Sequence, residues 1–199
     1  HVLFCKLEYK PMEKTMIKKN IIGIMIFVIM TGCGGDQPKQ DPDAALAKYK
    51  ECFTQNDFIC MSSMVLPSIV ESVGGVEGFV ETMASVPAFL EQVGMSMDNS
   101  KMQFGDRGPI ITDDDYLVSV IPTSIPITIN GQNALIESSV IGFSGDNGKT
   151  WFFIEGNDEG KMMIANESPR ILQKVDVPTP KLKINGQTMI QRNGQWIME

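Results

Sequence analysis

The chain of 199 residues has a single histidine, His1. The sequence after it therefore holds no Ser–His or Cys–His nucleophile pair, no imidazole general base and no histidine-ligated zinc or haem site. This absence excludes the mechanisms of most common hydrolases. The groups left for catalysis after residue 33 are carboxylates, lysines, arginines and two tyrosines, Tyr49 and Tyr116.

Basic residues are outnumbered by acidic ones, with 17 Lys and Arg against 24 Asp and Glu and a formal net charge of -7 at pH 7. An acidic protein repels the phosphates of nucleic acids and of anionic lipid headgroups. We therefore expect no nucleic-acid partner.

Long hydrophobic runs are also missing, apart from the uncharged stretch 21–30. At about 1.5 Å per residue, this stretch is far shorter than the ~30 Å hydrocarbon core of a bilayer. Lys18 and Lys19 precede it, and two small residues separate it from Cys33. The segment resembles the signal peptide and lipobox of bacterial lipoproteins. The resemblance implies cleavage before Cys33, a diacylglycerol on its sulfur and attachment to a membrane through this lipid.

The residue after Cys33 predicts the membrane in which the lipoprotein is anchored. Gly34, in place of aspartate, favours the periplasmic side of the outer membrane, by resemblance to Gram-negative lipoproteins. Retention at the inner membrane and exposure at the cell surface are alternatives. A short uncleaved anchor with an incidental cysteine is another.

The N-terminal part divides into three segments. The first residues have neither helical nor strand periodicity, so we interpret 1–15 as translated upstream sequence, with the true start at Met12 or Met16. Residues 16–32 form the predicted signal peptide. Residues 33–42 are polar and rich in turn formers, which is typical of a flexible tether.

Two further cysteines, Cys52 and Cys60, follow the tether. An exported protein folds in an oxidising compartment, where cysteine pairs form disulfides. The turn-forming pair Asn56-Asp57 lies between them. We therefore predict a disulfide that clamps a bend between two helices, and two small buried thiols are the alternative.

Helical periodicity begins after Asp41, which supplies an N-cap, and Pro42, which suits the first helical position. Three helices are predicted: one from Pro42, one over 58–66 that Pro67 interrupts or restarts, and one after Gly74-Gly75 that reaches Val93 with a bend near Pro87.

From Lys101 onward the pattern changes to β-branched and aromatic runs between turn residues. The expected strands are 110–120, 125–129, 134–143, 151–155 and 161–165. Asn-Gly pairs, which tolerate the positive φ angles of tight hairpins, occur at 130–131, 147–148, 185–186 and 193–194. Tight hairpin turns require neighbouring strands to be mostly antiparallel. Since the predicted helices come first and the antiparallel strands follow, the sequence predicts an α+β fold.

Three short motifs resemble the opening of NTF2-like (SnoaL-like, cystatin-like) domains: Asn56-Asp57-Phe58, Leu66-Pro67 and Gly74-Gly75-Val76-Glu77-Gly78-Phe79. The resemblance covers residues 43–175 and implies N-terminal helices packed on a curved antiparallel sheet. It also implies a cone-shaped pocket and a homodimer through the open sheet face. Residues 176–199 are predicted to form an extra C-terminal β-hairpin.

A motif in the second half has the spacing S-x-D-x-G-x-T-W and resembles the Asp-box of sialidases. Its residues are Ser144, Asp146, Gly148, Thr150 and Trp151. Asp146 can accept backbone N–H groups, Gly148 allows a positive φ, and Trp151 can pack beneath the turn. Asp-boxes repeat once per propeller blade, and the chain is too short for six blades. The single copy therefore predicts a rigid turn without a direct chemical role.

The run Asp113-Asp114-Asp115 and the adjacent Tyr116 are the remaining candidates for a chemical site. One carboxylate could act as a base beside Tyr116, or the cluster could bind Ca²⁺. Apolar residues on both sides favour an acidic surface turn instead, because alternation sends neighbouring carboxylates to opposite faces. We retain Asp115 and Tyr116 as catalytic candidates, and expect no metal and no cofactor.

Two functional classes are compatible with the sequence. The first is a non-enzymatic lipoprotein that binds a small apolar ligand in the cone or a partner protein of the envelope, and the missing histidines favour it. The second is an NTF2-like lyase or isomerase that uses a carboxylate and a tyrosine. An ionisable residue with a perturbed pKa inside the cavity would distinguish the second from the first.

Overall fold

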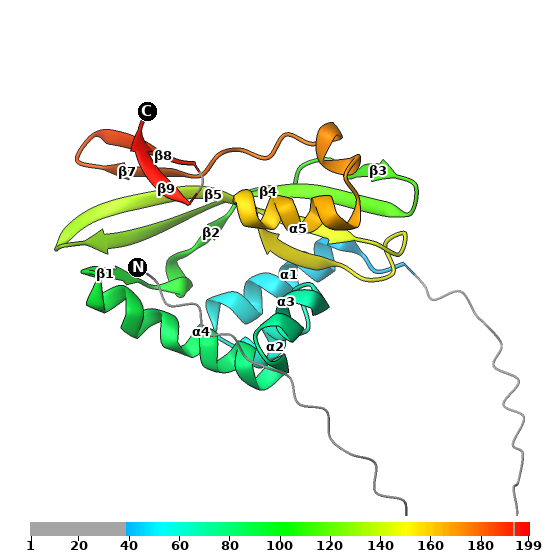
Figure 1. The fold of residues 1–199 in the computed structure, drawn as a ribbon, viewed down its shortest axis with the longest axis horizontal. Coiled ribbons are helices and arrows are strands. Elements are labelled where there is room, and N and C mark those ends of the chain that lie inside the picture. Colours follow the sequence, from blue (N-terminus) through cyan, green and yellow to red (C-terminus); the bar gives the residue numbers. More distant parts are fainter. Residues whose placement is uncertain (1–38, 193) are drawn as a thin grey trace, which may run out of the picture. The chain divides into compact units, whose positions relative to one another are not determined.

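The computed structural model describes residues 39–192 and 194–199, which belong to one compact unit, Gln37–Glu199. Cys33, the predicted signal peptide and most of the predicted tether lie outside the described residues. No helix within the described ranges is long and apolar enough to cross a membrane. The unit is α+β, with helices first and then a strongly curled antiparallel sheet (Figure 1).

Four helices open the unit: α1 Pro42–Thr54, α2 Phe58–Ser62, α3 Pro67–Ser72 and α4 Gly75–Gln92. The predicted helix over 58–66 is thus wrong in its second half. The helix ends at Ser62 with Ser63 as its C-cap, and Leu66, which precedes a proline and has ψ at 134°, is the N-cap of a new helix that begins at Pro67. The predicted N-cap of α1 is confirmed, since the Asp43 N–H donates to Asp41 Oδ1 at 3.0 Å.

The described residues contribute nine strands to the sheet: β1 Met95–Met97, β2 Gln103–Phe104, β3 Ile111–Asp113, β4 Tyr116–Ile129, β5 Gln132–Ser144, β6 Phe152–Glu155, β7 Lys181–Ile184, β8 Gln187–Arg192 and β9 Gln195–Met198. β4 and β5 pair along almost their whole length. β1, β2 and β3 line the other edge of β4, whereas β6 and β7 pair with β5, and β8 and β9 follow. Every pair is antiparallel, as predicted.

Two predicted Asn-Gly hairpin turns are confirmed. Asn130 and Gly131 join β4 to β5 with φ angles of 49° and 78°. Asn185 and Gly186 join β7 to β8 with φ angles of 52° and 77°. Both positions of each turn thus have the positive φ that favours these two residue types. Asn193 of the fourth pair lies outside the described residues.

The predicted strands 110–120 and 125–129 have wrong boundaries. A turn at Asp114, whose φ is 55°, separates β3 from β4, and β4 then runs through Pro122 and Pro126 without a break. The Gly105 N–H donates to the carbonyl oxygen of Pro122 at 2.8 Å, so the backbone groups of Pro122 face the β2 side. The missing N–H of this proline therefore removes no bond to β5.

The predicted strand 161–165 is wrong, because these residues belong to α5, Asp158–Glu167. Asn157 caps this helix, accepting the Gly160 N–H at 2.8 Å. A short apolar run fits a strand and a single helical turn equally well, and here the cap outside the run decides between them.

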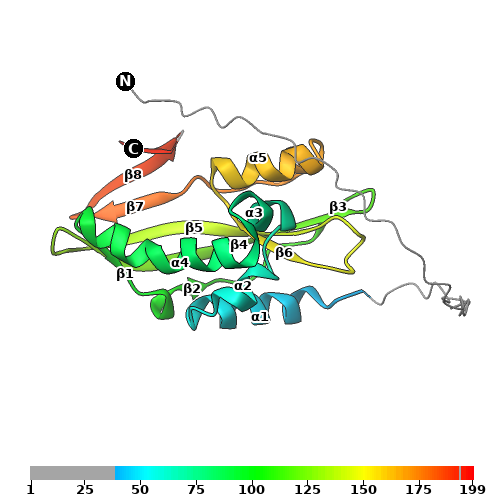
Figure 2. The ribbon, with the colours of Figure 1, turned by 60° about the horizontal axis from the view of Figure 1, so that its bottom comes forward.

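Helices lie on both faces of the sheet (Figures 1 and 2). α1 packs on one face, with α2 and α4 beside it, and α5 packs on the other with the 3-10 segment η2, Ile171–Lys174. Ile69 of α3 packs against the cluster that contains Ile164 and Ile171. Buried contacts on the first face join Leu46 and Tyr49 to Ile121, Val140 and Phe153. On the second face, Ile164 and Ile171 pack against Val118, Ile141 and Phe143.

The C-terminal extension is larger than the predicted hairpin. It has three strands, β7 to β9, and β7 pairs with β5, so the extension continues the main sheet. Leu182 of β7 is buried with Ile125, Ile127 and Ala134. The boundary predicted at residue 176 therefore does not separate two cores.

Candidate functional site

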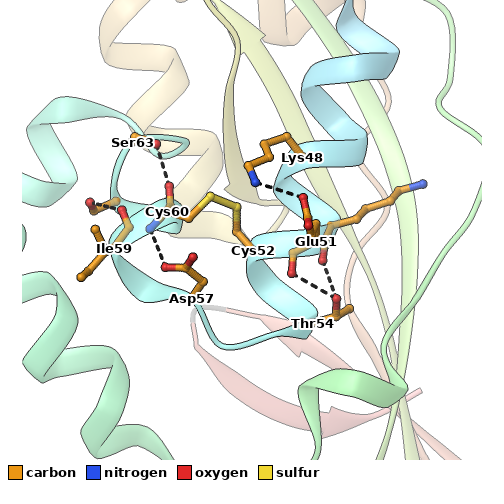
Figure 3. Close-up of a disulfide and its surroundings, with 10 residues drawn as sticks. Lys48, Glu51, Cys52, Thr54, Asp57, Ile59, Cys60 and Ser63 are labelled. Carbon is orange, nitrogen blue, oxygen red and sulfur yellow. Dashed lines mark hydrogen bonds and ion pairs between the residues drawn. A yellow bond between two sulfur atoms is a disulfide. The ribbon is translucent and has the colours of Figure 1, made fainter.

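A disulfide joins Cys52 of α1 to Cys60 of α2, as predicted, with their Cα atoms 5.7 Å apart (Figure 3). Asp57 begins the second helix at this corner, because its Oδ1 accepts the Cys60 N–H at 2.9 Å. Cys52 is buried in a cluster with Met61 and Phe79. The disulfide thus fixes the corner that supplies part of the cavity wall described below.

The Asp-box-like segment forms the predicted rigid turn. The Ser144 hydroxyl donates to Asp146 Oδ1 at 2.8 Å, and the Gly148 and Thr150 N–H groups donate to Ser144 Oγ and Asp146 Oδ1 at 2.9 Å each. Burial opposes ionisation of Asp146, but these donors outweigh it and lower the pKa of the carboxyl. Trp151 is buried beneath the turn.

The turn also holds the first described residues of the chain. The Gln40 N–H donates to the Gly148 carbonyl at 2.8 Å, and Lys39 Nζ donates to Asn147 Oδ1 at 3.0 Å. The Trp151 N–H donates to Gln40 Oε1 at 3.3 Å. These bonds anchor the start of the unit to the turn. The polar groups of the turn do not line the cavity that is described below.

The acidic run lies at the turn between β3 and β4. Asp113 accepts a bond from Lys174 Nζ at 2.7 Å, and Asp114 pairs with Arg170. The hydrogen bond from Lys174, with the charges of Arg170 and Lys174, lowers the pKa of Asp113. Tyr116 stacks on Phe143 with ring centroids 5.9 Å apart. Neither Asp115 nor Tyr116 lines the cavity, and no group of three acidic, Cys or His side chains in the described ranges is placed to hold a metal ion.

A cavity of about 440 Å³ lies between α1–α4 and the sheet, and extends to the start of α5. This volume falls within the roughly 300–1,000 Å³ common for ligand pockets. Most of its wall is apolar, and the apolar side chains come from every surrounding element: Phe53, Met61, Val65, Ile69, Phe79, Met83, Met97, Met102, Ile125, Ile136, Val140, Phe153, Ile154 and Met163.

Polar side chains gather at one end of this cavity, where β6 ends and α5 begins. Glu155 closes β6, and its Oε2 accepts a bond from Asn157 Nδ2 at 3.2 Å. Asn157 also caps α5, so the helix start positions the carboxyl. Glu159 of α5 and Tyr49 of α1 complete this end. The site thus combines residues from three separate elements.

Two serines of β5 line the cavity beside Glu155. β6 pairs with residues 140–143 of β5 and β7 with residues 134–137, so Ser138 and Ser139 lie at the gap between these two strands. The hydroxyl oxygens of both are buried without a hydrogen-bond partner, and Ser139 has no exposed surface. A Cβ at Gly156 would lie 2.1 Å from Ser139 Oγ, so only glycine leaves room for this hydroxyl. Buried hydroxyls without a partner are uncommon in folded proteins.

Two residues that line the cavity, Glu155 and Tyr49, have shifted pKa values. Loss of hydration raises the pKa of Glu155, and the charge of Glu159 adds to this shift, although part of the Glu155 side chain stays open to solvent. Burial, together with the charge of Glu155, raises the pKa of Tyr49. At neutral pH Tyr49 is therefore a neutral hydrogen-bond donor, next to a carboxyl that binds its proton more tightly than usual.

Glu155 and Tyr49 were not among the predicted site residues. Tyr49 fits the apolar stripe of α1, which conceals its polar end. One feature of the sequence does point to Glu155: a single carboxylate ends the apolar strand Phe152-Phe153-Ile154, directly before Gly156. An ionisable cavity residue with a perturbed pKa was the feature expected of an enzyme rather than a binding protein. The structure has such residues in Glu155 and Tyr49, and not in the predicted Asp115 and Tyr116.

Substitution of Glu155 by glutamine is expected to stabilise the protein at neutral pH and to have no effect at pH about 4 and below. The folded carboxyl has the higher pKa, so the folded state binds the proton more tightly and wild-type stability falls as pH rises above the unfolded pKa of about 4.3. Glutamine does not ionise. Urea unfolding of both proteins between pH 4 and 8 tests this, and equal pH slopes would contradict it.

The chain was compared with protein families, curated proteins and solved structures. No protein family, no curated protein and no solved structure matches this chain. A function can therefore be argued only from the residues of this chain.

Proposed function

We propose that the chain is a lipid-anchored envelope lipoprotein whose body binds a small, largely apolar ligand in the cavity between α1–α4 and the sheet. The observation that carries this proposal is the cavity of about 440 Å³, which has mostly apolar walls and a smaller number of polar groups. Small-molecule sites share this composition, because apolar walls supply affinity and a few polar groups orient the ligand.

The finer fold assignment belongs to the same proposal. A strongly curled antiparallel sheet with helices against one face supports an NTF2-like domain over residues 43–175. In such a domain the helices close one side of the curl and the pocket lies inside it. The cavity occupies the corresponding place, between the helices and the face of the sheet that carries Ile125, Val140 and Phe153.

The lipid anchor is supported by the sequence around Cys33 and by one feature of the body. Lys18 and Lys19, the apolar stretch 21–30 and Cys33 follow one another in the order of a lipoprotein signal. The disulfide in the body suits the oxidising compartment to which this signal leads. The tether would then connect the lipid to Lys39, which is held at the Asp-box-like turn.

Substitution of Cys33 by serine is expected to move the protein from the membrane fraction to the soluble fraction and to abolish labelling by an alkyne-tagged fatty acid. Without the sulfur no acyl chains attach, and no helix of the described ranges could replace them. Fractionation and in-gel detection measure both effects. Cys5→Ser is the matched control and should behave as wild type, whereas a membrane-bound, labelled Cys33→Ser would contradict the anchor.

Substitution of Ser138 by phenylalanine is expected to weaken binding of a neutral probe, phenethyl alcohol, by about tenfold or more, because the ring fills the cavity. Ser138 Oγ has no partner to lose. Isothermal titration of the whole chain in phosphatidylcholine nanodiscs, with empty nanodiscs as the blank, measures the Kd. Ser124→Phe, at a neighbouring β4 position that does not line this cavity, is the control. Equal binding by both variants would place the ligand elsewhere.

A second candidate function, an NTF2-like lyase or isomerase, is favoured by one observation. Glu155 has a raised pKa and lies near Tyr49, so it could take a proton from a bound ligand while the phenol donates a hydrogen bond. Exchange of a ligand C–H for deuterium in D₂O, followed by mass spectrometry, would support this function only if Glu155→Gln abolished it. Binding without exchange would favour the non-enzymatic role.

A further inference from the structure

We propose that the cavity selects a small apolar amine, bound as its ammonium ion, with the cationic head between Glu155 and the hydroxyl oxygen of Ser138. This inference rests on the proposed ligand-binding function and names the chemical class of the ligand. It follows from the sign of the charges at the polar end of the cavity and from the hydrogen-bonding atom left unused there.

The charges at the polar end are negative. Glu155 and Glu159 both line the cavity, and no lysine or arginine of the described residues does so. The nearest basic residue of α5, Lys161, lies outside the lining and pairs with Asp158 at 3.5 Å. The partial positive charge at a helix start is about half a unit, less than the charge of two carboxylates. A fatty acid or a phosphate ester would therefore meet repulsion at this end.

The unused hydrogen-bonding atom points to a donor on the ligand. The hydroxyl oxygen of Ser138 lines the cavity and is buried without a hydrogen-bond partner. Ser138 shares one face of β5 with Val140, which is the register partner of Glu155, so Ser138 and Glu155 lie on the same face of the sheet. An ammonium group has three donors and no acceptor, so it can donate both to a carboxylate and to a hydroxyl oxygen.

Binding of a cation also removes an unfavourable interaction within the empty site. Without a ligand, Glu155 loses hydration in the cavity and is repelled by Glu159. An ammonium ion beside Glu155 compensates both effects, since a carboxylate with an opposite charge at hydrogen-bond distance is stabilised in its ionised form. The apolar part of the ligand would then lie along the methionine and phenylalanine side chains of the wall.

The test compares three probes of equal shape and different charge: phenethylamine, phenethyl alcohol and hydrocinnamate. Each is titrated at pH 7 into the whole chain in phosphatidylcholine nanodiscs, with empty nanodiscs as the blank. We expect the amine to bind about tenfold tighter than the alcohol, because hydrogen bonds between charged groups exceed those between neutral groups. The carboxylate is expected to bind more weakly than the alcohol.

Glu155→Gln is expected to remove the preference for the amine, so that the amine and the alcohol bind with similar Kd values. Glutamine keeps the size of the side chain and an oxygen for Asn157. Glu167→Gln, at an exposed position in the last turn of α5, is the matched control and should keep the preference. Circular dichroism checks that both variants are folded.

The possible outcomes separate this inference from the function on which it rests. Equal Kd values for amine and alcohol in the wild type, or a preference that survives in Glu155→Gln, would overturn the amine while the bound alcohol still supports a ligand site. If none of the three probes binds, the proposed ligand site and the amine are both wrong.

Discussion

Substitution of Phe153 by alanine is expected to lower the free energy of unfolding by about 3–5 kcal/mol, the usual cost of removing a buried phenylalanine. The Phe153 side chain is 2% exposed and stacks on Tyr49 with ring centroids 4.8 Å apart. It therefore connects β6 to α1, the contact that joins the helices to the sheet. Urea unfolding followed by the fluorescence of the buried Trp151 measures the change.

Phe89→Ala provides the matched control for this prediction. Phe89 lies in α4 with 62% of its surface exposed, so the same substitution removes little buried area. Its effect should stay within about 0.5 kcal/mol, as for surface substitutions in general. Equal losses at the two positions would show that Phe153 does not hold the helices on the sheet.

Reduction of the disulfide between Cys52 and Cys60 is expected to lower the free energy of unfolding by about 2.5 kcal/mol. The bond closes a loop with a sequence separation of 8, and in the chain-entropy model such a loop limits the unfolded chain by about this amount. Urea unfolding with and without reductant measures the difference. The double variant Cys52→Ala, Cys60→Ala should match the reduced protein and should not respond to reductant. A wild type that does not respond either would contradict the prediction.

Loss of this disulfide should also affect the cavity. Phe53 follows Cys52 and Met61 follows Cys60, and both side chains line the cavity. A looser corner between α1 and α2 would therefore weaken ligand binding as well as stability, whereas Glu155→Gln is expected to stabilise the protein and to remove the preference for the amine. These opposite effects distinguish residues that hold the wall from residues that recognise the ligand.

Predictions about the fold were correct where the deciding residues lie within the predicted segment, and wrong where they lie outside it or carry no signal. The Asn-Gly turns at 130–131 and 185–186 were predictable because their positive φ angles depend on the two residues themselves. The segment 161–165 was not, since its four consecutive apolar residues satisfy either period and the Asn157 cap lies outside the run. The boundary between β3 and β4 was likewise hidden, because Asp114 adopts its left-handed conformation at a turn that carries no glycine.

Patterns of nearby residues were enough to predict the order of helices and antiparallel strands, the disulfide, and the turn from Ser144 to Trp151, because each depends on residues that are close along the chain. Only the tertiary structure decided where the candidate site lies. Tyr49, Ser138 and Glu155 belong to α1, β5 and β6, and they line one cavity because the curled sheet brings the end of β6 beneath α1 and leaves a gap before β7. The loss of hydration that sets the acidity of Glu155 exists only after this packing, so no pattern in the sequence could contain it.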